Sequence, residues 1–464
     1  MKNANKLQKV LMTACLAVLV FFAGTIALRL FTRQVLIVGM GMDNAFTRAV
    51  FFDNEDMRRL PGYQAMVYGD TDEGYYDWAS EYPFEDEEQT STDLTESSQT
   101  SILNRYVKLI GSLEGRIENY TQDTLMGYTT ITEIGSAYKK LIGWNFTSFG
   151  EYNGIYQLSD GYWTSLKAKK DMSAHIDAFL SLDKFCKEQN VDFLYVQAPY
   201  KVSKYEDTDV SGVVDFSNQN ADEVLDSLQK AAVDTLDLRE IIHQDGLSHH
   251  ELFFLTDHHW KGETGLWAAG KIAGILNENY DFQINLELLN PDNFTSVIYE
   301  DYFLGSLGRK VTLGRAEPEN ISLLYPNYET MLHFRIPSIG IDQTGDFSIT
   351  YNMEAVSEID YYNKDPYHAY SYGDRALIQY KNLDKNIDES TKILLVHDSF
   401  GDCMMSFLAL GVANLDAIDL RYFTGSLETY IKETQPDVVI LMYNIGELVV
   451  DVDMSDHTNL YDFR

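Results

Sequence analysis

The segment KILLVHDSFGDCMMSF, residues 392–407, decides the fold because a short apolar run ends there at two polar residues. The run has the length of a buried strand, and Asp398 and Ser399 follow it directly. We expect a helix to begin near Phe400. A turn between strand and helix would place the Ser399 hydroxyl where backbone N–H groups of the first helical turn can stabilise an oxyanion. Ser and Asp are also preferred helix N-caps, so a purely structural role is equally compatible with this segment.

Strands and helices alternate on both sides of this segment, from about residue 150 to the C-terminus. We predict strands at residues 191–198, 235–238, 392–397, 415–420 and 437–443, and helices at residues 173–189, 222–233 and 427–433. A further helix opens at residues 254–260 and runs through residue 276. Such βα alternation predicts an α/β fold, a parallel sheet with helices on both faces. Residues 285–388 are rich in Tyr, Asn and Pro, and we predict that they form a β-rich insertion.

The composition narrows the possible partners. Of the 464 residues, 45% are hydrophobic and 13% aromatic, which is typical of a folded chain with a sizeable core. The formal charge of −35 should repel phosphate backbones, so we expect no nucleic acid as a partner. Three Cys form no disulfide framework and no zinc ribbon, although Cys186 and Cys403 are one conceivable pair.

The N-terminal third is predicted to tether the chain. Residues 10–28 carry no charge and follow three Lys, which favours an uncleaved transmembrane anchor within residues 1–35 over a cleaved signal peptide. Residues 60–104 contain no Lys or Arg and are expected to form an acidic linker; a calcium site is the weaker alternative. Apolar residues at helical spacing over residues 102–117 predict an amphipathic helix. We therefore divide the chain into residues 1–35, 36–149 and 150–464, with the last unit outside the cytoplasm.

The segment FLTDHHW, residues 254–260, offers a second set of reactive side chains. An Asp two residues before a His can fix the imidazole tautomer and stabilise the imidazolium that forms when the His accepts a proton. In an extended segment, residues i and i+2 share a side, so the pair should be Asp257 and His259. His258 would then face elsewhere, as a packing or substrate-contact residue. The alternative is a helix cap with two packed His.

A third candidate is VVILMYNIGE, where a predicted strand ends at Asn444, two residues before Gly446. The Asn amide could supply a second oxyanion donor, although an ordinary turn residue is the simpler interpretation. In open parallel sheets, ligands bind beyond the carboxyl ends of the strands. Ser399 and Asn444 both follow such ends.

Together, these three segments resemble the DHHW family of bacterial envelope proteins, relatives of the alginate O-acetylation proteins that are built on an SGNH-hydrolase-like domain. The resemblance covers roughly residues 150–464 and implies an SGNH-like (flavodoxin-like) sheet. By this resemblance, Ser399 corresponds to the nucleophile, His259 to the base, Asp257 to its orienting partner and, more loosely, Asn444 to an oxyanion donor. The usual SGNH order places the Ser first and the Asp-His pair last, so the motif order here looks circularly permuted.

The resemblance also indicates residues for oxyanion or substrate binding. The block that holds an oxyanion Gly in SGNH proteins reads DLRYF at residues 419–423, so Arg421 either replaces a neutral donor or only packs. The GSLG motif at residues 305–308 is a familiar feature near the site in such sequences, which gives Gly305 and Ser306 a substrate-contact role. Lys201 resembles a Pro-x-Lys element, although an exposed Lys is the default. The remaining expected contacts are His258 and Trp260.

The function implied is that of a membrane-anchored, extracytoplasmic acetyltransferase or esterase that acts on a cell-envelope polysaccharide. A sugar hydroxyl as acceptor gives a transferase, and water gives an esterase. A single span does not itself carry acetyl across the membrane, so a transferase would need a multi-span membrane O-acyltransferase as its donor partner. No cofactor and no metal are expected.

Two other functions remain open. Five of the ten His lie within residues 243–259, which would suit a metal-dependent hydrolase, but the chain lacks an HExxH motif. The chain could instead be a non-catalytic glycan-binding or scaffold protein of an envelope polysaccharide system.

Overall fold

The computed structural model describes residues 141, 155–158, 160–206, 215–388, 390–449, 452 and 460–464. The chain divides into two units, Met1–Gly135 and Ser136–Arg464, and every described residue belongs to the second. The predicted anchor, acidic linker and amphipathic helix all lie outside the described residues. Among the described helices, none is long and apolar enough to cross a membrane.

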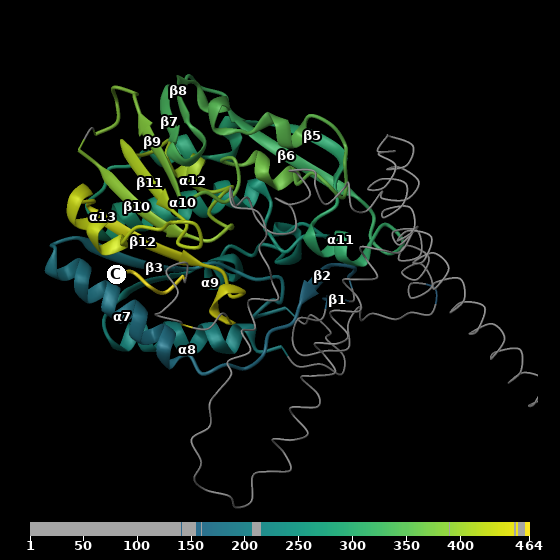
Figure 1. The fold of residues 1–464 in the computed structure, drawn as a ribbon, viewed down its shortest axis with the longest axis horizontal. Helices are drawn as coiled ribbons and strands as arrows, with labels where there is room; N and C mark the ends of the chain where they lie inside the picture. The colour runs from purple at the N-terminus through teal and green to yellow at the C-terminus, as the bar shows by residue number, and fades with distance from the viewer. Residues whose placement is uncertain are drawn as a thin grey trace, which may run out of the picture. The chain divides into compact units, whose positions relative to one another are not determined.

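An eight-stranded sheet forms the centre of the described unit, with the strand order β4-β3-β12-β10-β11-β9-β7-β8 (Figure 1). Five neighbouring strands run parallel: β4 (Asp234–Asp237), β3 (Asp192–Gln197), β12 (Val438–Tyr443), β10 (Lys392–His397) and β11 (Asn414–Ile418). These are the five strands predicted from the sequence, and each prediction is confirmed to within two residues at either end.

The prediction of a purely parallel sheet is wrong at one edge. Three antiparallel strands continue it beyond β11: β9 (Leu377–Asn382), β7 (Leu332–Ile336) and β8 (Ile341–Gly345). All three come from residues 285–388, which therefore extend the main sheet. In β7, buried and more exposed residues alternate, as expected for an antiparallel strand with one face in the core. The permuted motif order stays a prediction.

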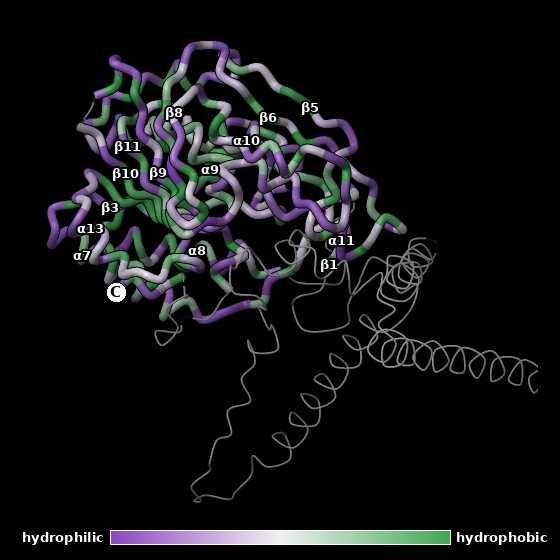
Figure 2. Tube along the Cα trace, turned by 45° about the horizontal axis from the view of Figure 1, so that its top comes forward, coloured by the Kyte–Doolittle hydropathy of each residue, from purple (hydrophilic) through white to green (hydrophobic). Residues whose placement is uncertain are grey.

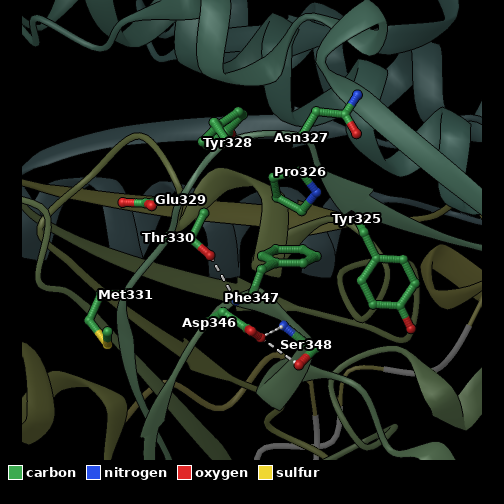
Figure 3. A pocket seen from close by; sticks show the side chains of 10 residues that line it. All are labelled: Tyr325, Pro326, Asn327, Tyr328, Glu329, Thr330, Met331, Asp346, Phe347 and Ser348. Carbon is green, nitrogen blue, oxygen red and sulfur yellow. Dashed lines mark hydrogen bonds between the residues drawn. The ribbon is translucent and has the colours of Figure 1, made fainter.

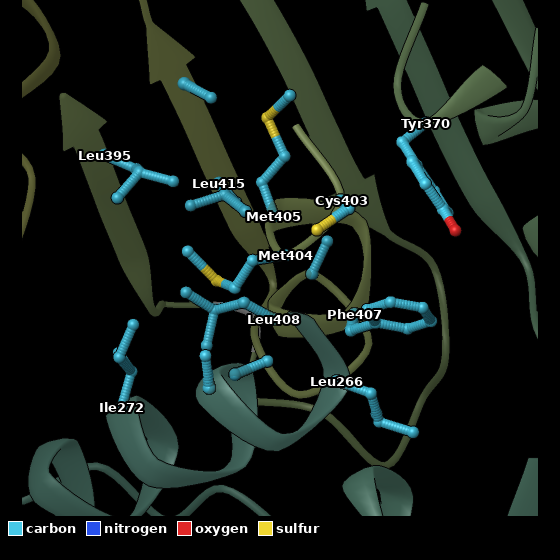
Figure 4. Close-up of a cluster of buried hydrophobic side chains, with 14 of the residues drawn as sticks. Leu266, Ile272, Tyr370, Leu395, Cys403, Met404, Met405, Phe407, Leu408 and Leu415 are labelled. Atoms are coloured by element: carbon cyan, nitrogen blue, oxygen red, sulfur yellow. The ribbon is translucent and has the colours of Figure 1, made fainter. Parts of the chain in front are cut away.

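Helices cover both faces of the sheet, as predicted. One face packs against α7 (Ser173–Glu188), α8 (Ser217–Lys230) and α13 (Leu427–Thr434). The other packs against α10 (Gly262–Asn279) and the single turn α12 (Met405–Leu408), whose apolar side chains are shown in Figure 4. Successive residues of β10 enter opposite cores: Leu394 and Val396 face the first, Ile393 and Leu395 the second. Apolar residues accordingly concentrate in the strands (Figure 2).

Smaller elements border this sheet. Two antiparallel hairpins are formed by β1 (Ile155–Gln157) with β2 (Trp163–Ser165) and by β5 (Phe294–Phe303) with β6 (Glu319–Pro326). Two short helices are α9 (Leu238–Gln244) and α11 (Ser306–Val311). Cys186 and Cys403 are free and buried in the cores on opposite faces of the sheet, so they do not pair.

Candidate active site

Ser399 follows β10, which lies between β12 and β11 in the sheet. The helix expected from Phe400 begins later, at Met405, because residues 399–404 form a turn. In that turn, the Asp398 carboxylate accepts the N–H of Phe400 at 2.9 Å. The side chain of Asp398 thus caps the turn and leaves the Ser399 hydroxyl available to another partner. A Cβ at Gly401 would come within 2.5 Å of the His397 ring, so a side chain there would disrupt this turn.

Residues 254–260, called the DHHW segment from here on, place an imidazole next to that hydroxyl. The segment closes on itself through a bridge between Phe253 and Trp260 and through the N–H of Phe254, which donates to the His259 carbonyl at 3.1 Å. His259 Nε2 lies 2.6 Å from Ser399 Oγ, and its Nδ1 lies 2.6 Å from Asp257 Oδ1. The structure therefore brings together the three residues that the sequence proposed for a triad. This arrangement is able to move a proton from the hydroxyl to the imidazole.

Asp257 is fully enclosed and held from several sides. Its Oδ1 also accepts the backbone N–H of His259 at 2.9 Å, and its Oδ2 accepts the backbone N–H of Ser306 at 2.5 Å. Burial alone would raise the pKa of this carboxyl, but the neighbouring imidazoles and these hydrogen bonds outweigh burial and lower the pKa well below its usual value. Asp257 is thus an ionised, oriented acceptor for the His259 ring.

Tyr367, in the 3-10 turn Pro366–Ala369, contacts both His259 and Ser399. Its ring stacks on the His259 ring with centroids 3.9 Å apart and an interplanar angle of 7°. Its hydroxyl donates to the backbone carbonyl of Ser399 at 3.0 Å. One buried side chain from residues 285–388 therefore fixes the plane of the imidazole and the backbone of the Ser.

Two ionisable residues, the half-buried Glu319 and the buried Lys201, hold the backbone just before Asp257. Glu319, at the start of β6, accepts the N–H groups of Leu255 and Thr256, each at 2.6 Å. Lys201 donates from the opposite side to the carbonyls of Leu255 at 3.1 Å and Trp163 at 2.7 Å. Lys201 is completely buried, contrary to the default of an exposed Lys, and burial lowers the pKa of its ammonium group to about 7. Its observed contacts are structural.

Asn444 lies at the end of β12, beside Asp398. Its backbone N–H and its side-chain amide both donate to Asp398 Oδ2, at 2.6 and 2.8 Å. Burial, reinforced by the charge of Glu447, raises the pKa of the Asp398 carboxyl to about 7. Asn444 is thus bonded to the residue that precedes Ser399, and its side-chain amide carries a second N–H.

Arg421 lies in an acidic network. Its guanidinium bonds to Asp419 at 2.6 Å and to Asp374 at 2.8 Å, and lies 3.9 Å from Glu447. These partners raise its pKa well above the usual value. The observed bonds of Arg421 are therefore to carboxylates that hold it in place.

The remaining expected contacts surround the Asp257–His259 pair. His258 Nδ1 lies 2.9 Å from the Ser306 hydroxyl, and burial lowers the pKa of its half-buried ring. Trp260 donates to the carbonyl of Phe400 at 2.9 Å and thereby ties the two segments of the site together. Gly305 packs against the Asp257 backbone, and a Cβ at this position would lie 2.3 Å from the Asp257 Cβ.

The five clustered His do not converge. His243 stacks on Tyr205, His249 Nε2 lies 2.5 Å from the Tyr200 carbonyl, and His250 Nε2 lies 3.1 Å from the Lys201 carbonyl. Asp257, His258 and His259 do offer ligand atoms within 4.8 Å of one another. However, both ring nitrogens of His259 already have partners, Nδ1 at Asp257 and Nε2 at Ser399.

The sequence did not indicate Tyr367, Glu319 or the backbone N–H of Ser306 in these roles. Tyr367 is one of 31 Tyr, and Glu319 opens an unremarkable β-strand. Both act on residues tens of positions away, and no local spacing in a single sequence reports such contacts. The one signal was the GSLG motif, which was expected near the site as a substrate contact. The structure places Gly305 and Ser306 beside Asp257, and the substrate-contact role stays a prediction.

Comparison with known proteins confirms the predicted resemblance. Residues 158–325 match the family model described as the SGNH hydrolase-like domain of the acetyltransferase AlgX. A search of curated proteins by sequence finds no match. Among solved structures, Bacillus cereus PatB1 with a sulfonyl adduct is 19% identical, with a TM-score of 0.53 over 67% of this chain and 98% of that one. A DHHW family protein from Eubacterium siraeum is 14% identical, with a TM-score of 0.49 over 66% and 95% of the two chains.

Proposed function

We propose that this chain, which carries an AlgX-type SGNH hydrolase-like domain, is an O-acetyltransferase or esterase that acts on a cell-envelope polysaccharide through Ser399. The observation that carries the proposal is the continuous hydrogen-bonded line from Asp257 through His259 to the Ser399 hydroxyl, with both contacts at 2.6 Å. The hydroxyl stands at the carboxyl end of a central parallel strand, where ligands bind in open α/β sheets.

In the proposed first half-reaction, Ser399 Oγ attacks the acetyl carbonyl while its proton passes to His259 Nε2. Asp257 stabilises the imidazolium. The tetrahedral intermediate collapses as the leaving group takes the proton from His259, and the acetyl group remains on Ser399. In the second half, His259 removes a proton from a sugar hydroxyl or from water, whose oxygen attacks the acetyl carbonyl. Ser399 Oγ then departs and regains its proton from His259.

The oxyanion needs at least one donor during both halves. We assign this role to Asn444, whose side-chain amide is bonded to Asp398, the residue before Ser399, and carries a second N–H. Arg421 is the weaker choice because its guanidinium already bonds to Asp419 and Asp374.

We further propose that residues 10–28 anchor the chain in the membrane and that the domain works outside the cytoplasm. A donor is then needed that brings acetyl groups across the membrane, and a multi-span membrane O-acyltransferase fits this requirement. The acceptor would be a polysaccharide of the cell envelope.

The test incubates the purified chain with p-nitrophenyl acetate and follows both nitrophenol release and intact mass. We expect a transient gain of one acetyl group on Ser399 in the wild type. Ser399→Ala should remove the adduct, and His259→Ala should slow its formation. Equal ester cleavage by wild type and Ser399→Ala would refute the triad. Cleavage by both at no more than the rate in buffer alone would favour a non-catalytic glycan-binding protein.

A metal-dependent hydrolase is distinguished in the same experiment. Asp257, His258 and His259 are the residues that would hold the ion. If activity required added zinc and disappeared with a chelator while Ser399→Ala remained active, the metal would be the catalyst.

A further inference from the structure

A second concave surface lies outside the Ser399 site. It is a cleft of about 570 Å³ between two chain segments, residues 325–331, which include the end of β6, and residues 346–348 after β8 (Figure 3). None of its lining residues belongs to the proposed triad or to its hydrogen-bond partners. The cleft therefore calls for a separate explanation.

Aromatic rings and polar groups line this cleft together. Tyr325 and Tyr328 are partly exposed on the first segment, and Phe347 of the second segment is buried (Figure 3). Asn327, Glu329 and Ser348 add exposed polar side chains. Aromatic faces combined with a few polar groups are the usual lining of small-molecule sites, and this combination suits the mixed apolar and hydroxylated faces of a sugar.

The two walls are fixed before any ligand arrives. The Phe347 N–H donates to Thr330 Oγ1 at 2.8 Å and ties one segment to the other. Asp346 Oδ1 accepts the N–H of Ser348 at 2.9 Å, and the Tyr328 hydroxyl donates to the Leu288 carbonyl at 2.5 Å. A preformed wall lowers the entropic cost of binding.

The cleft is coupled to the Ser399 segment by direct packing. Phe347 stacks on Phe407 of α12, with centroids 5.5 Å apart, and Phe407 lies eight residues after Ser399 in the core drawn in Figure 4. A second line of neighbouring rings runs from Phe347 through Tyr351, Tyr370 and Tyr367 to His259, with centroid distances of 5.6, 6.1, 5.3 and 3.9 Å. The cleft is thus connected to the proposed base through four ring-to-ring contacts within the core.

The charge of the cleft restricts its ligand. Glu329 and Asp346 are both exposed at its rim, and none of its ten lining residues is Lys or Arg. The chain as a whole carries a formal charge of −35. A polymer of uronic acids would meet like charge at every residue, whereas a neutral or amino-bearing sugar would not.

We propose that this cleft is a saccharide-binding subsite for neutral or amino-bearing hexosamine units of the acceptor glycan, and that it excludes polyuronates. The inference rests on the proposed function, because it takes the polysaccharide class from there and narrows it. The site would hold the acceptor chain while a neighbouring sugar hydroxyl reaches Ser399.

The test measures binding by saturation-transfer NMR on the full chain carrying Ser399→Ala. Three tetrasaccharide probes are compared: N-acetylglucosamine tetramer, glucosamine tetramer and galacturonate tetramer. We expect the first two to bind and the third to bind at least about tenfold more weakly, which corresponds to about 1.4 kcal/mol. Tight binding of galacturonate, or no binding of either hexosamine probe, would overturn the proposal.

Two variants locate the site. Tyr328→Ala should weaken binding of both hexosamine probes, and Glu329→Lys, at an exposed position, should weaken glucosamine binding and strengthen galacturonate binding. The matched control is Tyr205→Ala, which removes an exposed Tyr from a different cleft of about 280 Å³. If Tyr205→Ala reduces binding while the other two variants do not, the assigned cleft is wrong.

These measurements also separate the two proposals. Because the protein carries Ser399→Ala, binding does not depend on acyl transfer. Normal acetylation of wild-type Ser399 without hexosamine binding would overturn the subsite alone. Binding that depends on Tyr328, together with failed acetylation, would overturn the proposed acyl transfer alone.

Discussion

At the scale of single residues, the site depends on side chains that do not take part in proton transfer. Tyr367 combines a ring parallel to the His259 imidazole with a hydroxyl bonded to the Ser399 carbonyl. These two contacts are chemically separable, because Phe retains the ring and Leu retains neither. The residue thus positions the base and the nucleophile against each other.

We therefore expect a graded response at Tyr367. Tyr367→Phe should lower kcat/KM for acetyl esters by up to about tenfold, since one buried hydrogen bond is lost. Tyr367→Leu should lower kcat/KM further, because the imidazole also loses its stacking partner. The control is Tyr351→Phe, which removes an equally buried hydroxyl bonded to the Leu324 carbonyl at 2.7 Å. Equal losses in Tyr367→Phe and Tyr351→Phe would mean that general destabilisation explains the effect.

Two glycines should respond in opposite directions to the same substitution. At Gly305, a new Cβ would lie 2.3 Å from the Asp257 Cβ, so Gly305→Ala should lower the free energy of unfolding by about 1–3 kcal/mol and reduce activity. At Gly274, inside α10, a new Cβ meets nothing within 4 Å, so Gly274→Ala should stabilise by about 0.5–1 kcal/mol. Urea denaturation of both variants checks the pair. A harmless Gly305→Ala would show that the contact with Asp257 is not close in solution.

At the scale of elements, the five parallel strands were predictable, whereas the antiparallel strands and the connections were not. Parallel strands such as β10 and β12 are buried on both faces, and their continuous apolar runs are visible in the sequence. α12 was expected to begin at Phe400, because Asp398 and Ser399 resemble an ordinary cap. In the structure, Asp398 caps a turn instead, and that turn delays the helix to Met405.

The contacts of the candidate site also divide into those that the sequence predicts and those that it does not. Asp257 and His259 are two positions apart, so their hydrogen bond follows from local geometry. The contacts of Tyr367 with His259 and of Glu319 with Leu255 join residues that are distant in the chain. These contacts form only in the folded domain, where β6 and the 3-10 turn Pro366–Ala369 lie against the DHHW segment.

The buried Lys201, which holds the DHHW segment through the Leu255 carbonyl, predicts a specific pH dependence of the free energy of unfolding. Burial lowers the pKa of Lys201 from 10.5 to about 7, so between these pH values the unfolded chain binds a proton that the folded chain lacks. This group therefore adds stability as pH rises through that window. Relative to Lys201→Met, the free energy of unfolding of the wild type should increase between pH 7 and pH 10.

The measurement compares urea midpoints of wild type and Lys201→Met across that range. The exposed Lys169→Met serves as the control and should run parallel to the wild type. A pH-independent difference between wild type and Lys201→Met would contradict a lowered Lys201 pKa.

At the scale of the whole molecule, residues 285–388 belong to the main core. They supply three strands to the central sheet, and they supply Tyr367 and Glu319 to the site. Alternating strands of this kind are short and half-buried, so the sequence alone suggested a β-rich insertion within the domain of residues 150–464. The sheet and the active site are instead incomplete without them.

Two substitutions within residues 285–388 test whether this part of the chain folds together with the main core. Phe334→Ala in β7 removes a fully buried ring and should lower the free energy of unfolding by about 3–5 kcal/mol. Val297→Ala in β5, where the side chain is 43% exposed, should change it by no more than about 0.5 kcal/mol. Unfolding is followed by tryptophan fluorescence, to which Trp163 and Trp260 contribute. If Phe334→Ala left that transition unchanged, the segment would fold as an independent unit.

The position of β10 in the sheet has a kinetic consequence. Both edges of this strand are hydrogen-bonded to parallel neighbours. The DHHW segment is held instead by one bridge, by single backbone hydrogen bonds such as that from Phe254 to His259, and by side chains such as Lys201 and Glu319. Amide hydrogens of the DHHW segment should therefore exchange with solvent well before those of β10, because local opening there leaves the sheet intact. Warming would separate the base from the nucleophile while the domain is still folded, so activity would be lost reversibly below the melting temperature.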